Sequence, residues 1–201
     1  MTPTKGQRTR AGIVERSAPV FNTKGFFGAS MGDLVRATGL GKGGIYNHFS
    51  GKEELALEAF DYSVAIMRER FSRALEGRAS ALEKLFAVVD VLGSLADDPP
   101  VAGGCPVLNT AIESDDAHPA LKERAAVAST EWLRLVGSLV REGVGSGELR
   151  PDVDARATAS VVVAALEGAV MLGKLHDDPA HMERTIGHLK GYLKSLTRED
   201  G

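Results

Sequence analysis

The segment from Gly39 to Gly44 has the residue types that most directly indicate a chemical function. It reads GLGKGG, and short glycine-rich turns of this kind either bind phosphate groups or join two helices. The segment fits the dinucleotide-binding pattern GxGxxG, but such a site also needs a preceding strand and a βαβ unit around it. No stretch upstream alternates as a strand does, and Arg36 stands where a P-loop requires its first glycine. We therefore favour a turn between two helices and expect no enzyme.

The residues around this turn predict two short helices. Ser30 favours the N-cap of a helix over 31–38, and Gly39 favours its C-terminal end. A second short helix is expected over 42–48. Two such helices joined by a glycine-containing turn form a helix–turn–helix, whose second helix can enter the major groove of DNA. The outward residues of that second helix would be Lys42, Gly43, Tyr46 and Asn47.

A longer helix over 6–24 is expected to support the two short ones. Pro19 lies inside it and should bend it or remove a hydrogen bond, and Gly25 should end it. Apolar residues of all three helices would form a small shared core: Val14, Phe21, Leu34, Leu40 and Ile45.

The charge of the chain is unevenly distributed. Residues 1–52 hold eight basic and two acidic side chains, a net charge of +6, whereas the whole chain of 201 residues has a net charge of −3. This asymmetry is typical of a protein whose N-terminal part alone meets phosphate groups. A solvated basic arm would give the same pattern, so charge by itself leaves both interpretations open.

The rest of the chain shows helical periodicity. Ser50 is expected to cap a long fourth helix, with Glu53 three residues later completing a capping box. The apolar residues of that helix repeat every three or four positions: Leu57, Phe60, Val64, Met67, Phe71 and Leu75. Further helices are predicted over 80–97, 105–115, 119–143, 154–175 and 179–196. About nine helices without strands make the fold class all-α.

Residues 25–55 resemble the DNA-binding domain of the TetR family of repressors. The motif residues are Gly25-Phe26, Ser30, Ala37-Thr38-Gly39, Tyr46, Phe49 and Lys52-Glu53-Glu54-Leu55. The resemblance implies a three-helix helix–turn–helix DNA-binding head in residues 1–52. It also implies a helical ligand-binding and dimerisation bundle in residues 53–201, which matches the family only in helix count and length.

The resemblance implies DNA contacts at the start of the second helix, along the recognition helix and at the start of the fourth helix. These positions are Ser30, Lys42, Gly43, Gly44, Tyr46, His48 and Lys52, and outward spacing adds Asn47. One position departs from the family, since most relatives have Ser or Thr where this chain has Gly44. Two adjacent helical glycines cost about 1 kcal/mol each relative to Ala, so we expect a loose recognition helix.

Seven side chains of the predicted bundle, residues 53–201, are candidates for contact with an effector: Met67, Phe86, Cys105, Asn109, Trp132, Glu167 and Met171. Most have the spacing of core residues, and side chains with that spacing more often pack in the core than contact a ligand. Glu167 is more informative because it lies in an otherwise apolar helix, where a buried carboxylate needs a partner. That partner could be an effector, a second subunit or water.

Cys105 is the single cysteine, so the chain has no internal disulfide. The surrounding segment, GGCPVLNTAIE, resembles a stretch that lines the effector pocket in some TetR-type regulators. A helix starting near Pro106 could lower the pKa of the thiol and make it reactive. The alternative is a small buried apolar side chain.

The sequence predicts a cytoplasmic protein with no membrane partner. It has no apolar N-terminal stretch typical of a secretion signal, and its most apolar segment, 157–173, is shorter than the roughly 20 residues that a bilayer span needs. A loop holds His176, Asp177, Asp178 and His181, but a solvated turn explains this cluster better than a metal site. We expect no metal and no cofactor.

The resemblance implies a homodimer formed by the helices over 154–175 and 179–196. A stripe of apolar residues on the first of these could form the dimer contact or the core of the monomer: Ala155, Ala159, Val163, Leu166 and Val170. We expect a repressor that a small-molecule effector releases from a double-stranded, palindromic operator. The alternatives are a regulator that senses electrophiles or oxidants through Cys105, and a ligand-binding protein that has lost DNA binding.

Overall fold

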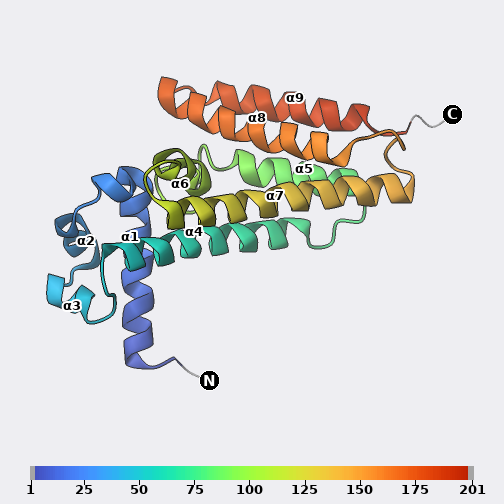
Figure 1. Ribbon diagram of the computed structural model, residues 1–201. Coiled ribbons are helices and arrows are strands. Elements are labelled where there is room, and N and C mark those ends of the chain that lie inside the picture. Colours follow the sequence, from blue (N-terminus) through green and yellow to red (C-terminus); the bar gives the residue numbers. More distant parts are fainter. Residues whose placement is uncertain (1–2, 199–201) are drawn as a thin grey trace. The chain divides into compact units, whose positions relative to one another are not determined.

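The computed structural model describes residues 3–198, and these form nine α-helices and no β-strand (Figure 1). The helices are α1 (Lys5–Gly28), α2 (Met31–Thr38), α3 (Lys42–Tyr46), α4 (Lys52–Leu75), α5 (Ala81–Gly93), α6 (Pro106–Ser114), α7 (Pro119–Ser146), α8 (Ala155–His176) and α9 (Ala180–Ser195). The predicted all-α fold class and the helix count are confirmed for this part of the chain.

The helices belong to two compact units, each formed from two stretches of the chain. Unit 1 contains the described part of Met1–Met67 together with Pro100–Ala126. Unit 2 contains Arg68–Pro99 and the described part of Val127–Gly201. The long helices α4 and α7 therefore contribute residues to both units. The described residues of the predicted head all lie in unit 1, and the functional boundary after residue 52 stays a prediction.

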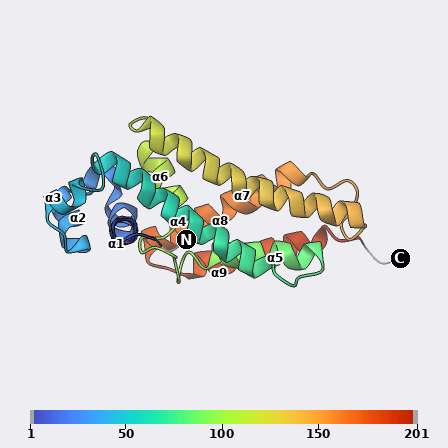
Figure 2. The same cartoon turned by 90° about the horizontal axis from the view of Figure 1, so that it is seen from below.

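In unit 1, α2 packs against α1 and α3, and the three helices lie side by side in both views (Figure 1 and Figure 2). Their core is formed by buried apolar side chains: Ile13, Val14, Leu34, Ile45, Phe49 and Leu55. Phe21 and Leu40 are partly buried against this core, so the predicted shared core is confirmed. Truncation of a buried Ile or Leu to Ala costs about 2–5 kcal/mol, and this packing therefore fixes the orientation of α3.

α1 begins with a capping box and is interrupted near its end. The Thr4 hydroxyl accepts the backbone N–H of Gln7 at 3.3 Å. Gly25 has φ +73° and ψ 170°, outside the helical region, so regular helix ends where the sequence predicts. Pro19 lies inside α1 as predicted, and the backbone at this residue stays helical.

α2 begins and ends at the predicted residues. Ser30 and Asp33 satisfy each other's backbone N–H groups at its start, and Gly39 adopts a left-handed φ of +72° at its end. α3 is shorter than the predicted 42–48, because its helical backbone ends at Tyr46.

The predicted capping box of α4, with Ser50 as the cap and Glu53 as its partner, is wrong at both positions. α4 begins at Lys52, one position later than a Ser50 cap would give. The acceptor is therefore Glu54 and not Glu53: its carboxylate accepts the backbone N–H and the hydroxyl of Ser50 at 2.6 and 2.7 Å.

In unit 2, α8 packs against α5 and α9. The apolar stripe of α8 that the sequence left open is mainly core of the monomer, because Ala159, Val163, Leu166 and Val170 are buried and only Ala155 is half-buried. A different face of α8 is exposed and carries Ala157, Val161, Ala164, Met171 and Leu175. α8 is long and apolar enough to cross a membrane by length and composition alone, with a mean hydropathy of 1.5. Core helices of helical bundles meet the same criterion.

Candidate nucleic-acid interface

α3, the predicted recognition helix, is anchored on one side and exposed on the other. Ile45 is 1% exposed and packs into the core of unit 1. The four residues predicted to face outward are all exposed, and Tyr46 is the largest of them, at 50%. Gly44 is half-buried against Leu40, to which a Cβ at Gly44 would come within 3.4 Å. The exposure of this face is confirmed, and its contact with DNA stays a prediction.

Ser30 and His48, two further predicted DNA contacts, each have a role inside unit 1. The Ser30 hydroxyl donates to the Asp33 carboxylate at 2.6 Å and accepts the Asp33 N–H at 3.1 Å. The His48 carbonyl accepts a hydrogen bond from the Arg10 guanidinium of α1. Ser30 is exposed and His48 is half-buried. Both positions remain compatible with the predicted phosphate contacts.

Lys52 is engaged within the protein. Its ammonium donates to the carbonyls of Phe26 at 2.7 Å and Ala29 at 3.1 Å, and lies 4.3 Å from the centroid of the Phe26 ring. A lysine ammonium has three donors, so one remains for the predicted phosphate contact. These contacts hold the start of α4 against the joint between α1 and α2, which we define as residues 25–30. The sequence did not predict this structural role.

Glu113 holds that joint from another helix. Its carboxylate accepts the backbone N–H groups of Phe26 at 2.7 Å and Phe27 at 3.0 Å. The two N–H groups point toward α6 because Gly25 breaks the helix just before them. The ring of His118, which is buried, packs edge-on against Phe26, with centroids 4.5 Å apart. No sequence signal pointed to Glu113, because its partners are backbone groups far away in the chain.

Asn109, one of the predicted effector contacts, connects α6 to α1. Its amide nitrogen lies 3.1 Å from the Asn22 carbonyl, 3.0 Å from the Asn22 side-chain oxygen and 2.8 Å from the Gly103 carbonyl. Asn22 in turn donates to the carbonyls of Val101, Ala102 and Gly104. The donors of Asn109 are therefore occupied inside unit 1, which makes it a poor ligand contact.

Asp33 binds two of the basic side chains of unit 1. Lys24 and Arg36 both form ion pairs with its carboxylate. The hydrogen bond from Lys24, followed by those from Ser30, holds the pKa of Asp33 well below its usual range. Two of the basic side chains that suggested phosphate binding thus share one carboxylate inside unit 1, which offsets one of their two charges.

The other predicted effector contacts lie in both units. Met67 and Cys105 are fully buried in unit 1, and the Cys105 sulfur caps α6 by accepting the Leu108 N–H at 3.4 Å. In unit 2, Phe86 and Glu167 are half-buried. Met171 is 46% exposed on α8, so the expectation that it has core burial is wrong.

Trp132 is the remaining predicted contact, and its indole N–H is unusual. The side chain is 2% exposed in unit 2, and its ring lies edge-on to Phe71, with centroids 6.0 Å apart. Its Nε1 atom is buried without an acceptor among the described residues. A buried donor left unpaired costs about 1–3 kcal/mol, so this position favours a partner that brings an acceptor.

The last loop shows no metal-binding geometry. The rings of His176 and His181 have centroids 5.6 Å apart. Residues 3–198 contain no group of three or more His, Cys, Asp or Glu side chains that could hold a metal ion.

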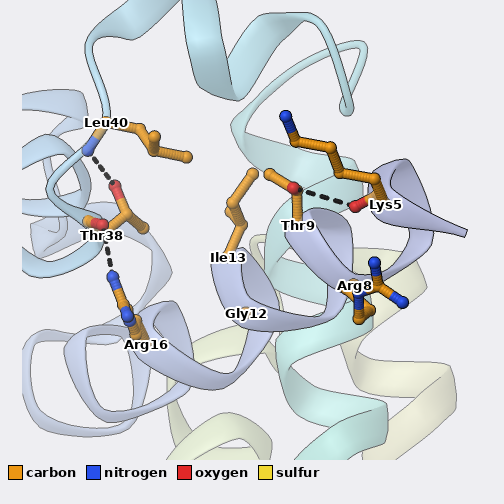
Figure 3. Close-up of a pocket in the computed structure, with 8 residues that line it drawn as sticks. All are labelled: Lys5, Arg8, Thr9, Gly12, Ile13, Arg16, Thr38 and Leu40. Carbon is orange, nitrogen blue, oxygen red and sulfur yellow. Dashed lines mark hydrogen bonds between the residues drawn. The ribbon is translucent and has the colours of Figure 1, made fainter.

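Unit 1 also contains a groove that the sequence did not predict. It has a volume of about 320 Å³ and lies between the first turns of α1 and the turn from α2 to α3 (Figure 3). Its lining residues are Lys5, Arg8, Thr9, Gly12, Ile13, Arg16, Thr38 and Leu40. The charge count includes three of them, but the motif that assigns DNA contacts begins only at residue 25.

Comparisons with known proteins agree with this architecture. Residues 13–59 match the bacterial regulatory proteins of the tetR family, and residues 81–189 match the tetracyclin repressor-like C-terminal domain. The second match covers more than half of the chain and lies outside the head. Family membership therefore rests on both parts of the molecule.

Individual relatives cover most of the chain. A TetR transcriptional regulator from Chloroflexus aurantiacus J-10-FL has a crystal structure that is 45% identical over 96% of this chain and 98% of its own, with a TM-score of 0.93. The transcriptional regulator AcuR of Cereibacter sphaeroides is 30% identical over 82% of this chain and 77% of its own. A cysteine mutant of the TetR family regulator CifR, complexed with 26 bp double-strand operator DNA, shares the fold at 24% identity, with a TM-score of 0.76 over 92% and 95% of the two chains. The chain belongs to the TetR family of transcriptional regulators.

Proposed function

We propose that this protein is a ligand-responsive repressor that binds a palindromic operator as a homodimer. The observation that carries the proposal is the exposed face of α3, which buried Ile45 fixes on unit 1. A two-fold dimer presents two such helices to successive major grooves, about 34–36 Å apart. The operator complex of CifR, a protein of the same fold, supports this mode of binding.

Lys42 is the cation best placed to read DNA from α3. It is exposed, and its ammonium forms no hydrogen bond or ion pair with another described residue. A lysine at the start of a recognition helix can donate to guanine O6 and N7 or to a phosphate. A Cβ added to the neighbouring Gly43 would meet no atom within 4 Å, so DNA can approach the backbone closely there.

Substitution of Tyr46 tests the interface. The Tyr46→Ala variant should bind the operator at least about thirtyfold more weakly, since one contact of about 1–3 kcal/mol is lost in each of the two heads. Its thermal stability should stay near that of the wild type because the side chain is half exposed. Gel shift on the DNA upstream of the protein's own gene measures the affinity.

The control for that measurement is Val127→Ala, which truncates a side chain that is 54% exposed and lies outside α3. It should bind as the wild type does. Wild-type affinity in the Tyr46→Ala variant would show that α3 is not the recognition helix.

The exposed face of α8 is the surface we assign to the dimer. Val161 is 50% exposed, Met171 46% and Leu175 70%, and small residues lie between them. On the neighbouring helix α9, Gly187 and Gly191 have no atom within 4 Å of a Cβ position, which leaves room for a partner helix. Burial of such a face in a second copy removes its apolar surface from water.

An effector with an oxygen acceptor would satisfy the buried indole N–H of Trp132. α4 belongs to both units, so a shift of this helix on effector binding would change the spacing of the two recognition helices. A ligand that favours the non-binding spacing releases the operator in proportion to its differential affinity for that state. Such a regulator acts where DNA is, in the cytoplasm.

Sensing through Cys105 is the second candidate function. It has one structural support, since Cys105 caps α6, the helix that also carries Glu113 to the joint between α1 and α2. Oxidation would remove that cap. The thiol is fully buried, however, so a reagent can reach it only after local opening of unit 1.

A further inference from the structure

The basic residues of the head differ in what balances their charge. Arg10, Lys24 and Arg36 form ion pairs with carboxylates inside unit 1. Arg16 donates to the Thr38 carbonyl at 2.8 Å, and Lys52 donates to two carbonyls. These five side chains have structural partners, and they are poor candidates for the main anchors of a DNA backbone.

Three other basic residues differ from these five in their hydrogen-bond and ion-pair partners: Lys5, Arg8 and Lys42. The ammonium groups of Lys5 and Lys42 have no hydrogen bond or ion pair with any residue of the described chain. Arg8 uses one donor, to the Pro3 carbonyl at 2.8 Å, and no carboxylate in residues 3–198 pairs with it. A guanidinium has five donors, so Arg8 keeps most of its hydrogen-bonding capacity.

Two of these three residues line the groove between α1 and the helix–turn–helix, which we name the α1 groove (Figure 3). None of its lining residues is acidic, and Thr9 adds a hydroxyl. Leu40, on the opposite wall, lies two residues before Lys42 at the start of α3. The α1 groove therefore adjoins the end of the recognition helix that meets DNA first.

When a recognition helix enters the major groove, the sugar-phosphate strands at its edges meet the protein surface beside that helix. We propose that the α1 groove holds a phosphate group of the operator backbone, with Lys5 and Arg8 as its anchoring cations. This inference rests on the proposed function and extends the DNA contacts to α1. The phosphate fixes the position of the head on the duplex and carries no sequence information.

Two glycines of α1 allow the groove to be blocked without a change in charge. Gly12 lines the groove, and nothing lies within 4 Å of a Cβ built on it, so Gly12→Leu would fill open space. Gly6 has the same open surroundings but does not line the groove. Gly6→Leu is therefore a matched control in the same helix, and both changes favour helix over glycine.

The experiment measures operator affinity against salt concentration for the wild type, the Lys5→Ala/Arg8→Ala double variant, Gly12→Leu and Gly6→Leu. Loss of one phosphate contact per head should lower the salt slope by about one per head, or about two per dimer. The double variant and Gly12→Leu should both show this loss, on operator and unrelated duplex alike. Gly6→Leu should keep the wild-type slope.

A wild-type slope in the double variant, or equal behaviour of Gly12→Leu and Gly6→Leu, would overturn the proposal. A second arm adds inorganic phosphate at constant ionic strength and follows thermal stability. Stabilisation that disappears in the double variant, with an unchanged DNA slope, would assign the groove to a free anion and also reject the proposal. If the wild type itself binds no duplex, the proposed function fails, which is a separate result.

Discussion

The joint between α1 and α2 and the recognition helix α3 satisfy their polar groups in opposite ways, although both belong to unit 1. At the joint, Glu113 accepts two backbone N–H groups and Lys52 donates to two backbone carbonyls. α3 begins without a side-chain cap, and Lys42 on its exposed face has no partner among the described residues. The joint is held by hydrogen bonds from α4 and α6, and α3 mainly by the apolar packing of Ile45.

This difference suggests two separate tasks: the joint fixes the position of the helices, and α3 is the part proposed to contact DNA. A joint with paired polar groups keeps α2, and with it α3, in one place relative to α1, which lowers the entropy lost when DNA is bound. In the proposed function, α3 uses its unpaired donors for bases and phosphates, and its two glycines let its backbone adapt. Changes at the joint should therefore act on stability, and changes in α3 should act on binding.

The largest effect is expected at the joint. Glu113→Ala leaves the N–H groups of Phe26 and Phe27 without their acceptor, and hydrogen bonds to a charged group contribute about 1.5–3 kcal/mol. We expect the free energy of unfolding to fall by about 2 kcal/mol, measured by urea denaturation followed by circular dichroism.

The conservative variant separates the hydrogen bonds from general packing. Glu113→Gln keeps one oxygen acceptor and nearly the same volume, so it should lose clearly less stability than Glu113→Ala. Equal urea midpoints for wild type and Glu113→Ala would mean that the carboxylate does not hold the joint, and the contrast with α3 would disappear.

The same contrast explains which features could be predicted from the sequence. The ends of α2 were predicted correctly because Ser30 and Gly39 are local signals. The end of α3 was not, since beyond Tyr46 tertiary contacts take over: Phe49 enters the core and the His48 carbonyl bonds to Arg10. Local chemistry thus determines both ends of α2, and long-range contacts determine where α3 ends.

The site was predictable to the same limited extent. The exposed face of α3 follows from helical spacing, and its exposure is confirmed. The internal bonds of Lys52 and Asn109 could not be foreseen, because their partners lie 26 and 87 residues away in the chain. Whether Lys52 also touches DNA stays a prediction. The α1 groove depends on the same kind of long-range packing, between α1 and the residues that follow α2.

A smaller effect is expected in α3. A Cβ at Gly43 meets nothing within 4 Å, and one at Gly44 meets Leu40 at an ordinary 3.4 Å, so both Ala variants fit the fold. Each should stabilise the protein by up to about 1 kcal/mol, the difference in helix propensity between Gly and Ala.

Binding should respond differently at the two glycines. Gly43 is exposed and Gly44 is half-buried, so Gly43→Ala should weaken operator binding more than Gly44→Ala does, because its methyl group stands between backbone and DNA. Thermal unfolding and gel shift on the same preparations test both statements. A destabilised Gly43→Ala protein would contradict the view that α3 has no internal constraint at this position.

The smallest effect is expected at the start of α4, the helix whose first residue, Lys52, contacts the joint. The backbone hydrogen bond from Ser50, followed by the bond from Arg10, lowers the pKa of Glu54 from 4.5 to about 2. A carboxyl whose pKa is lower in the folded state stabilises the fold above its unfolded pKa, and this contribution is lost as the pH falls from about 4.5 to about 2. Glu54→Gln should therefore flatten the decline of the urea midpoint across that pH window.

The Glu54 effect should be modest because the side chains of Glu54 and Arg10 are 37% and 32% exposed, and solvent screens their attraction. The control is Glu123→Gln, an exposed carboxylate in the part of α7 that belongs to unit 1, which should leave the decline unchanged. Equal pH profiles for wild type and Glu54→Gln would show that the start of α4 is held by apolar packing, as α3 is. The joint would then depend on Glu113 and Lys52 alone for its polar contacts.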